Sequence, residues 1–199
     1  MIRGPHPIRS KRHIMSQLSD LLTEYRDQLG MTLLDRSRQR PLLMLFLRHA
    51  GCTFCRQALA DLATARQKLE AGGTGLLLVF LDAEAVAGPL AASYGLGDLP
   101  RVCDTQQRLY QAFGLARGDM ARVAGPAVWW RGLKAILEGH MVGVPRGDVT
   151  QMPGAFVVDN GEIVAAFRHA TSADRPDYCE LAKAGTHRPS GAPVPTSAG

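Results

Sequence analysis

Two apolar runs limit the possible folds of this chain more than any other feature. Leu42–Leu47 and Gly75–Leu81 are both the length of a strand and are apolar on both faces of an extended segment. Such runs are typical of central strands in a parallel sheet that helices cover on both sides. Between them, Phe54–Ala71 has its apolar residues on one helical stripe and ends at Gly72. This order of strand, helix and strand predicts an α/β fold.

The rest of the chain carries signals that extend this alternation. Leucines and a tyrosine at helical spacing predict a first helix over Ser16–Gln28, closed by Gly30. A short strand is expected at Pro100–Cys103, and Asp104 follows as the N-cap of another helix, with Gln107 at the capping-box position. The other expected helical features are a helix within Ala83–Tyr94 that Pro89 breaks or delays, closure of the Asp104 helix by Gly114, and a last helix that Thr171–Asp174 caps and that runs through Lys183.

An antiparallel hairpin is the clearest local signal late in the chain. Ala155–Asp159 and Glu162–Phe167 are strand-like segments that flank Asn160-Gly161. Asn-Gly suits a two-residue type I′ turn, because both central residues of that turn need a positive φ. The whole pattern predicts a mixed central sheet, mostly parallel, with an antiparallel C-terminal hairpin at its edge and helices on its flanks.

Length and composition indicate one folded unit with two terminal extensions. A chain of 199 residues is long enough for one ordinary domain but hardly for two cores. We therefore expect a single domain over residues 15–185. Residues 1–14 hold basic and no acidic side chains and are expected to form a disordered arm, and the Pro- and Gly-containing tail 186–199 is also expected to be disordered.

Charge and hydropathy exclude several classes of protein. The net charge is +5, but the basic arm contributes +4 of it, so the nearly neutral body lacks the basic surface that nucleic acid requires. No apolar run approaches the ~18 residues of a membrane-spanning helix, and the arm lacks the apolar centre of a secretory signal. We expect a cytoplasmic protein without a membrane or nucleic-acid partner, whose four cysteines do not form a disulfide framework.

The motif Cys52-Thr53-Phe54-Cys55 follows the first apolar strand and opens the next helix. At that position the unpaired N–H groups and the dipole of the helix stabilise a thiolate, and helix N-termini lower thiol pKa values to roughly 3.5–7.5. A thiolate attacks disulfide or peroxide, and a second thiol three residues on can resolve the mixed disulfide. We therefore predict that Cys52 and Cys55 are catalytic and that Thr53 and Phe54 line the substrate site.

The cysteine pair also has interpretations other than a redox one. A structural zinc site usually needs a second short-spaced ligand pair, whereas Cys103 and Cys179 are 76 residues apart. A merely structural pair is a further alternative. Haem attachment is excluded, because Arg56 stands where a CxxCH motif needs histidine. In the redox interpretation, Arg56 and His49 could add positive potential beside the thiolate.

A second landmark is the dipeptide Met152-Pro153, just before the expected hairpin. In a thioredoxin-like sheet the matching proline is cis and faces the CxxC motif, leaving a backbone edge that can pair with an extended peptide. We therefore expect Met152 and Pro153 in the substrate site. Trp130 and Arg131 precede them and could line the same site. The alternative for Trp130 is packing in the core, and the alternative for Arg131 is a solvated or ion-paired side chain.

Several of these segments together resemble the peroxiredoxin-like proteins of the alkyl hydroperoxide reductase/thiol-specific antioxidant group, within the thioredoxin superfamily. The resemblance covers roughly residues 32–184. It implies a thioredoxin-like fold, an antioxidant or thiol–disulfide oxidoreductase activity, and no bound organic cofactor. The segments that carry it are LFLRHAGCTFCR (45–56), VWWRGL (128–133), QMPGAFVVD (151–159) and FRHATSADRPD (167–177).

The chain departs from this group in one motif. Peroxiredoxins carry Pro-x-x-x-Thr-x-x-Cys, in which Pro and Thr pack around the attacking cysteine. Counted back from Cys55, the Thr and Pro positions hold Cys52 and Arg48, and counted back from Cys52 they hold His49 and Leu45. The sequence therefore predicts a thiol oxidoreductase that reduces disulfides or peroxides through its CxxC pair, and leaves efficient peroxidase activity open.

The order of attack follows from the position of each sulfur. Cys52 is expected to attack because it lies at the helix start, and Cys55 to resolve; the peroxiredoxin register would reverse these roles. The electron donor would be the thioredoxin or glutathione system, and a homodimer is one option for the assembly. The alternative from another class is a non-catalytic thiol module that binds zinc or a protein partner through the same pair.

Overall fold

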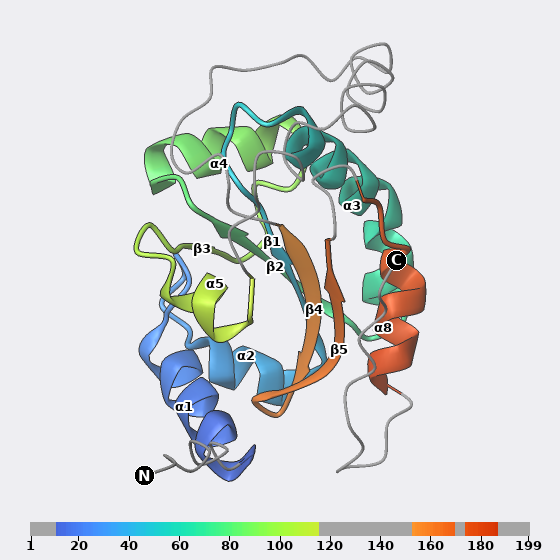
Figure 1. Cartoon of the computed structure of the whole chain (residues 1–199). Coiled ribbons are helices and arrows are strands. Elements are labelled where there is room, and N and C mark those ends of the chain that lie inside the picture. Colours follow the sequence, from blue (N-terminus) through green and yellow to red (C-terminus); the bar gives the residue numbers. More distant parts are fainter. Residues whose placement is uncertain (1–10, 116–152, 170–173, 187–199) are drawn as a thin grey trace, which may run out of the picture.

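A computed structural model describes residues 11–115, 153–169 and 174–186 of the chain. Within these residues, five strands form one sheet in the order β3-β2-β1-β4-β5 (Figure 1). β1 pairs in parallel with β2, as β2 does with β3, whereas β4 is antiparallel to both β1 and β5. The predicted mixed sheet is therefore confirmed. The strands are β1 (Leu42–Phe46), β2 (Gly75–Phe80), β3 (Arg101–Cys103), β4 (Gly154–Asp159) and β5 (Glu162–Arg168).

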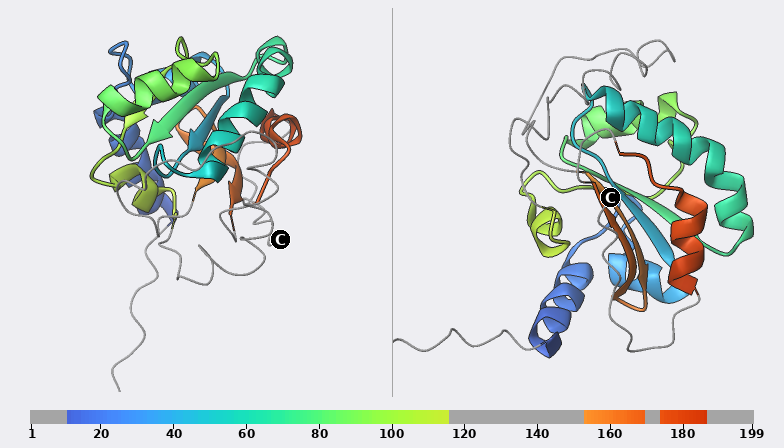
Figure 2. Two further views of the ribbon diagram at one scale, coloured as in Figure 1. Left: turned by 90° about the horizontal axis from the view of Figure 1, so that it is seen from above. Right: turned by 45° about the vertical axis from the view of Figure 1, so that its right-hand side comes forward.

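Helices cover both faces of this sheet (Figure 1, Figure 2). β1 and β2 are buried along their whole length, as expected for strands that are apolar on both faces. Alternate residues of β1 enter two separate cores: Leu43 and Leu45 face the core below α3, α4 and α8, whereas Met44 and Phe46 face the core below α1, α2 and α5. The helices are α1 (Lys11–Glu24), α2 (Leu33–Gln39), α3 (Thr53–Ala71), α4 (Glu84–Ser93), α5 (Arg108–Ala112) and α8 (Tyr178–Thr186).

The hairpin has the turn that its sequence predicts. Asn160 and Gly161 both have positive φ, 50° and 80°, as a type I′ turn requires. Ser37 of α2 holds the turn from outside, because its carbonyl accepts the N–H of Asn160 at 3.0 Å and its hydroxyl oxygen accepts that of Gly161 at 3.0 Å. This contact ties the hairpin to a helix that is distant in sequence.

The N-terminal region differs from the expected single helix over Ser16–Gln28. α1 begins at Lys11, inside the expected arm, and ends at Glu24. A second helix, α2, was not expected. Thr32 is its N-cap and accepts the N–H of Asp35 at 3.0 Å, while Leu33 and Leu34 are buried against the sheet. The helix is short, so its stability depends on this cap and on tertiary burial rather than on sequence periodicity.

Three other helices also differ from what the sequence predicts. α4 runs unbroken through Pro89. Pro89 removes the hydrogen bond to Ala85 four residues earlier, and both residues are exposed. α5 begins at Arg108 rather than next to Asp104, although the Asp104 carboxylate still accepts the N–H groups of its first turn. α8 begins at Tyr178, where the Asp177 carboxylate accepts the N–H groups of Cys179 and Glu180. The expected start directly after Asp174 is therefore too early, and residues 171–173 lie outside the described residues.

Candidate active site

The loop after β1 places the two predicted cysteines at the N-terminus of α3. Cys52 is the N-cap residue of α3, and its own N–H donates to the His49 carbonyl at 2.9 Å. Two further hydrogen bonds hold the loop: the Ala50 N–H donates to the Asp82 carboxylate at 2.7 Å, and Arg56 Nε donates to the Ala50 carbonyl at 3.1 Å. The strand end, the loop and the helix start therefore form one hydrogen-bonded unit around the sulfurs.

Cys52 and Cys55 lie together, and both are free thiols. Both are buried, with 6% and 3% of their surface exposed. Arg48 contacts each of them. Its backbone N–H donates to Cys55 Sγ at 3.2 Å, and its guanidinium Nη1 lies 3.8 Å from Cys52 Sγ.

The two thiols differ strongly in acidity. The hydrogen bond from the Cys55 thiol is the main cause that lowers the pKa of Cys52 to about 6; the charge of Arg48 and the N–H groups of Cys55 and Phe54 act in the same direction, while burial opposes them. Burial raises the pKa of Cys55 well above its usual range, and the hydrogen bond and charge of Cys52 raise it further. Cys52 is the thiolate of the pair at neutral pH, and Cys55 holds the proton.

This difference predicts a specific pH profile. With a pKa of about 6, about a tenth of Cys52 is thiolate at pH 5 and about nine tenths at pH 7, so its alkylation by iodoacetamide should rise between these values and then level off. Burial and the nearby Glu84 raise the pKa of Cys103 to about 11, so its alkylation should still be rising at pH 9. Residue-resolved mass spectrometry measures both. A Cys52 profile with an ordinary midpoint above pH 8 would contradict the assignment.

His49 does not supply the positive potential that the sequence suggested. It is 5% exposed, and burial together with the charge of Arg48 lowers its pKa, although Asp82 acts in the opposite direction. The imidazole is therefore neutral at pH 7. The positive charge at the sulfurs comes from Arg48 instead, a residue that sequence reasoning noted only as a replacement for the family proline.

An apolar pocket adjoins Cys55. Pro153 lies in its wall together with Phe54, so the structure brings these two expected site residues to the cysteine pair, whereas Thr53 is buried at the helix start. Met152, and with it the expected cis bond to Pro153, lies outside the described residues, as do Trp130 and Arg131. The lining residues are Leu45, Phe46, Leu47, Arg48, Phe54, Cys55, Ala58, Pro153 and His169.

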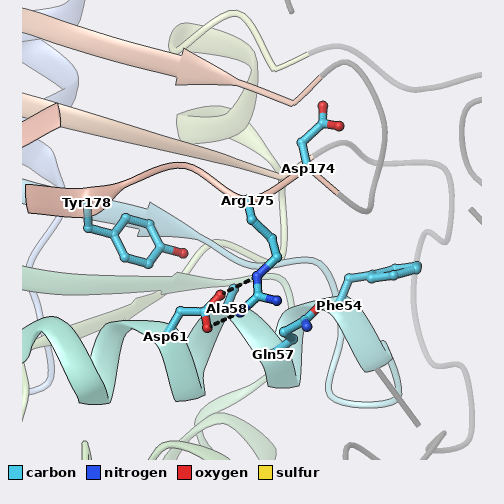
Figure 3. Close-up of a pocket in the computed structure, with 7 residues that line it drawn as sticks. All are labelled: Phe54, Gln57, Ala58, Asp61, Asp174, Arg175 and Tyr178. Carbon is cyan, nitrogen blue, oxygen red and sulfur yellow. Dashed lines mark hydrogen bonds and ion pairs between the residues drawn. The ribbon is translucent and has the colours of Figure 1, made fainter. Parts of the chain in front are cut away.

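A second, more polar hollow continues along α3 (Figure 3). Phe54 and Ala58 line both hollows. The Arg175 guanidinium crosses to Asp61 of α3 and forms two hydrogen bonds with its carboxylate, at 3.0 and 2.6 Å. Arg175 and Asp61 are 114 residues apart in the sequence. Gln57, Asp174 and Tyr178 complete this hollow.

The other two cysteines lie elsewhere. Cys103 is at the end of β3, where its sulfur lies 3.6 Å from a Glu84 carboxylate oxygen, and Cys179 is in the first turn of α8. In the described part of the chain, no group of three or more His, Cys, Asp or Glu side chains is arranged to hold a metal ion. The zinc-binding alternative therefore gains no support from these residues.

The model of the family described as AhpC/TSA antioxidant enzyme matches residues 61–171, more than half of the chain. The chain belongs to the AhpC/TSA antioxidant enzyme family. The predicted relationship is thus confirmed, and the protein is a thiol oxidoreductase. The matched stretch begins after Cys55, so it includes neither of the two cysteines.

Individual proteins of known structure or function are also similar to this chain. Prostamide/prostaglandin F synthase from Danio rerio is 26% identical over 153 residues, which are 74% of this chain and 75% of that protein. The bacterioferritin comigratory protein of Xanthomonas campestris superposes with a TM-score of 0.58 at 16% identity, over 84% of this chain and 94% of that one. Peroxidoxin BcpB from Mycobacterium tuberculosis gives 0.56 at 15% identity, over 82% and 91%. The two structures show that the fold is shared, and they confirm the predicted thioredoxin-like architecture.

Among residues 11–115, 153–169 and 174–186, none of the helices has the length and the apolar composition needed to cross a membrane.

Proposed function

We propose that the protein reduces peroxides, and disulfides as a second substrate class, through Cys52 and Cys55. The observation that supports this most directly is the geometry of the pair: the two sulfurs lie at the start of α3, with the Arg48 guanidinium 3.8 Å from Cys52 Sγ and the Arg48 N–H 3.2 Å from Cys55 Sγ. This setting lowers the pKa of Cys52, while burial raises that of Cys55. A nucleophile and a proton-bearing partner are the two groups that a dithiol reaction needs.

The proposed reaction with a hydroperoxide has two steps, one at each cysteine. The Cys52 thiolate attacks the outer oxygen of a hydroperoxide, the O–O bond breaks, and the alcohol leaves as it takes up a proton. The product is a sulfenic acid on Cys52. The Cys55 sulfur attacks this group, and water leaves with the Cys55 proton, so that a Cys52–Cys55 disulfide forms. With a disulfide substrate, Cys52 attacks first and forms a mixed disulfide. Cys55 then attacks the Cys52 sulfur and releases the rest of the substrate.

The oxidised pair must then be reduced for a second turnover. A dithiol of the thioredoxin type, or glutathione, supplies two electrons and two protons and restores both thiols. The cytoplasm, where these systems keep thiols reduced, is the setting proposed for the protein. The apolar pocket beside Cys55 favours organic hydroperoxides over hydrogen peroxide as substrates, because Leu45, Leu47 and Ala58 line it.

Peptide mapping tests this proposal. The fully reduced protein is treated with one equivalent of cumene hydroperoxide, or of hydrogen peroxide in a parallel sample, and its free thiols are then blocked at acidic pH. We expect an intramolecular disulfide between Cys52 and Cys55, released again by dithiothreitol, and unmodified Cys103 and Cys179. Oxidation confined to Cys103 or Cys179, or a Cys52–Cys55 pair that stays reduced while peroxide is consumed, would refute it.

A further inference from the structure

Arg48 occupies an unusual place beside the two sulfurs. It is buried, with 4% of its surface exposed, and it reaches Cys55 through its backbone and Cys52 through its side chain. In the family motif counted back from Cys55, this position belongs to proline. Proline has no N–H and no charge, so it could make neither contact. The substitution therefore adds one donor and one cation to the redox pair.

We propose that Arg48 is a positioning residue that selects Cys52 as the attacking thiol and favours the reduced form of the Cys52–Cys55 couple. The inference depends on the proposed dithiol function, since it concerns the same pair. It assigns to one side chain an effect on both the choice of nucleophile and the oxidising strength of the couple, in addition to the effect of the hydrogen bond from the Cys55 thiol.

The selection follows from the geometry of the two contacts. The guanidinium lies 3.8 Å from Cys52 Sγ, whereas the direct contact of Arg48 with Cys55 Sγ is its backbone N–H, at 3.2 Å. The charge of Arg48 also acts on Cys55, but burial outweighs it there. A full positive charge stabilises an anionic sulfur more than the dipole of one amide does, and burial strengthens the attraction because water does not screen it. The negative charge of the pair therefore resides on Cys52.

The effect on the redox couple follows from what oxidation removes. When the pair is oxidised by a disulfide, Cys52 and Cys55 form their S–S bond and the substrate S–S bond breaks. The electron pair and the Cys55 proton leave with the substrate, as one thiol and one thiolate. The Cys52 sulfur is then neutral, and Arg48 loses an anion at close range while remaining buried. Stabilising the reduced form makes a couple more oxidising, so Arg48 should raise its reduction potential.

The experiment compares Arg48→Met, Arg48→Gln and Arg48→Lys with the full-length parent. The control is Arg38→Met, which removes the same charge from an exposed side chain of α2. One readout is the rate of Cys52 alkylation at pH 6.5. The other is the equilibrium between thiols and disulfide in glutathione buffers. The backbone N–H to Cys55 survives every substitution, so the variants isolate the guanidinium.

We expect Arg48→Met and Arg48→Gln to slow Cys52 alkylation by roughly tenfold and to shift the couple toward disulfide by a similar factor, about 30 mV. Arg48→Lys should restore most of both values, and Arg38→Met should match the parent. If Arg48→Met fails to fold by circular dichroism, the comparison of Gln with Lys decides. Equal behaviour of the neutral and lysine variants, or parental values in a folded Arg48→Met, would overturn the proposal.

A failure of the Arg48 proposal can be distinguished from a failure of the proposed dithiol function. Neither readout requires peroxide turnover. If the parent never forms the Cys52–Cys55 disulfide in any buffer, the dithiol function fails, and the Arg48 proposal fails with it. If the parent couple titrates normally and the Arg48 variants titrate identically, only the inference about Arg48 is lost.

Discussion

Cys52→Ser should lower peroxide turnover by at least about a thousandfold, as removal of a catalytic nucleophile generally does. A serine hydroxyl stays protonated at neutral pH, so neither Arg48 nor the helix start can turn it into a nucleophile comparable to a thiolate with a pKa of about 6. Cys55→Ser should also stop repeated turnover, but for a different reason: Cys52 still attacks once, and its sulfenic acid then has no resolving thiol.

Single-turnover trapping separates these two variants. Dimedone, which reacts with sulfenic acids, should label Cys52 in Cys55→Ser and should label nothing in Cys52→Ser. Cys103→Ser and Cys179→Ser are matched controls, and both should turn over like the parent because their sulfurs lie outside the site. Dimedone label on Cys55 of the Cys52→Ser variant would instead establish the peroxiredoxin register, with Cys55 as the attacking residue.

Phe46→Ala is expected to have the largest effect on stability, about 3–5 kcal/mol less free energy of unfolding. Phe46 is fully buried at the end of β1, and its ring packs against the rings of Tyr110, Phe113 and Phe156 at centroid distances of 5.0, 4.8 and 5.4 Å. These partners come from two different elements and cannot all move into the space that the ring leaves. The same residue lines the pocket beside Cys55, so peroxide activity should fall as well.

Urea unfolding followed by circular dichroism measures this loss. Leu29→Ala is the control, because Leu29 is a large apolar residue that is 66% exposed and should change the free energy of unfolding by less than ~0.5 kcal/mol. A loss below ~1.5 kcal/mol for Phe46→Ala, an ordinary value for a mutation outside a core, would show that the four rings do not form a tightly packed unit.

Local patterns were enough to predict the sheet. Leu42–Phe46 and Gly75–Phe80 could be recognised because a strand buried on both faces must be apolar at every position, whatever its neighbours are. The Asn160-Gly161 turn could be recognised because few residue pairs tolerate two successive positive φ values. The helices were harder to predict from local patterns. α2 lacked a periodic apolar stripe, and only the Thr32 cap, with Asp35 three residues on, signalled it.

In the candidate site, too, local sequence predicts some features and tertiary packing decides the others. Sequence alone located Cys52 and Cys55 at a strand–helix junction, because spacing and neighbouring patterns fix where a helix starts. Which sulfur is ionised was decided by the folded chain: burial depth, the orientation of the Arg48 guanidinium and the neutral state of His49 depend on how α3 packs on the sheet. The pairing of Arg175 with Asp61 likewise needed two distant segments to meet. Backbone preferences act over a few residues, whereas charge and desolvation act through space between groups that only tertiary packing brings together.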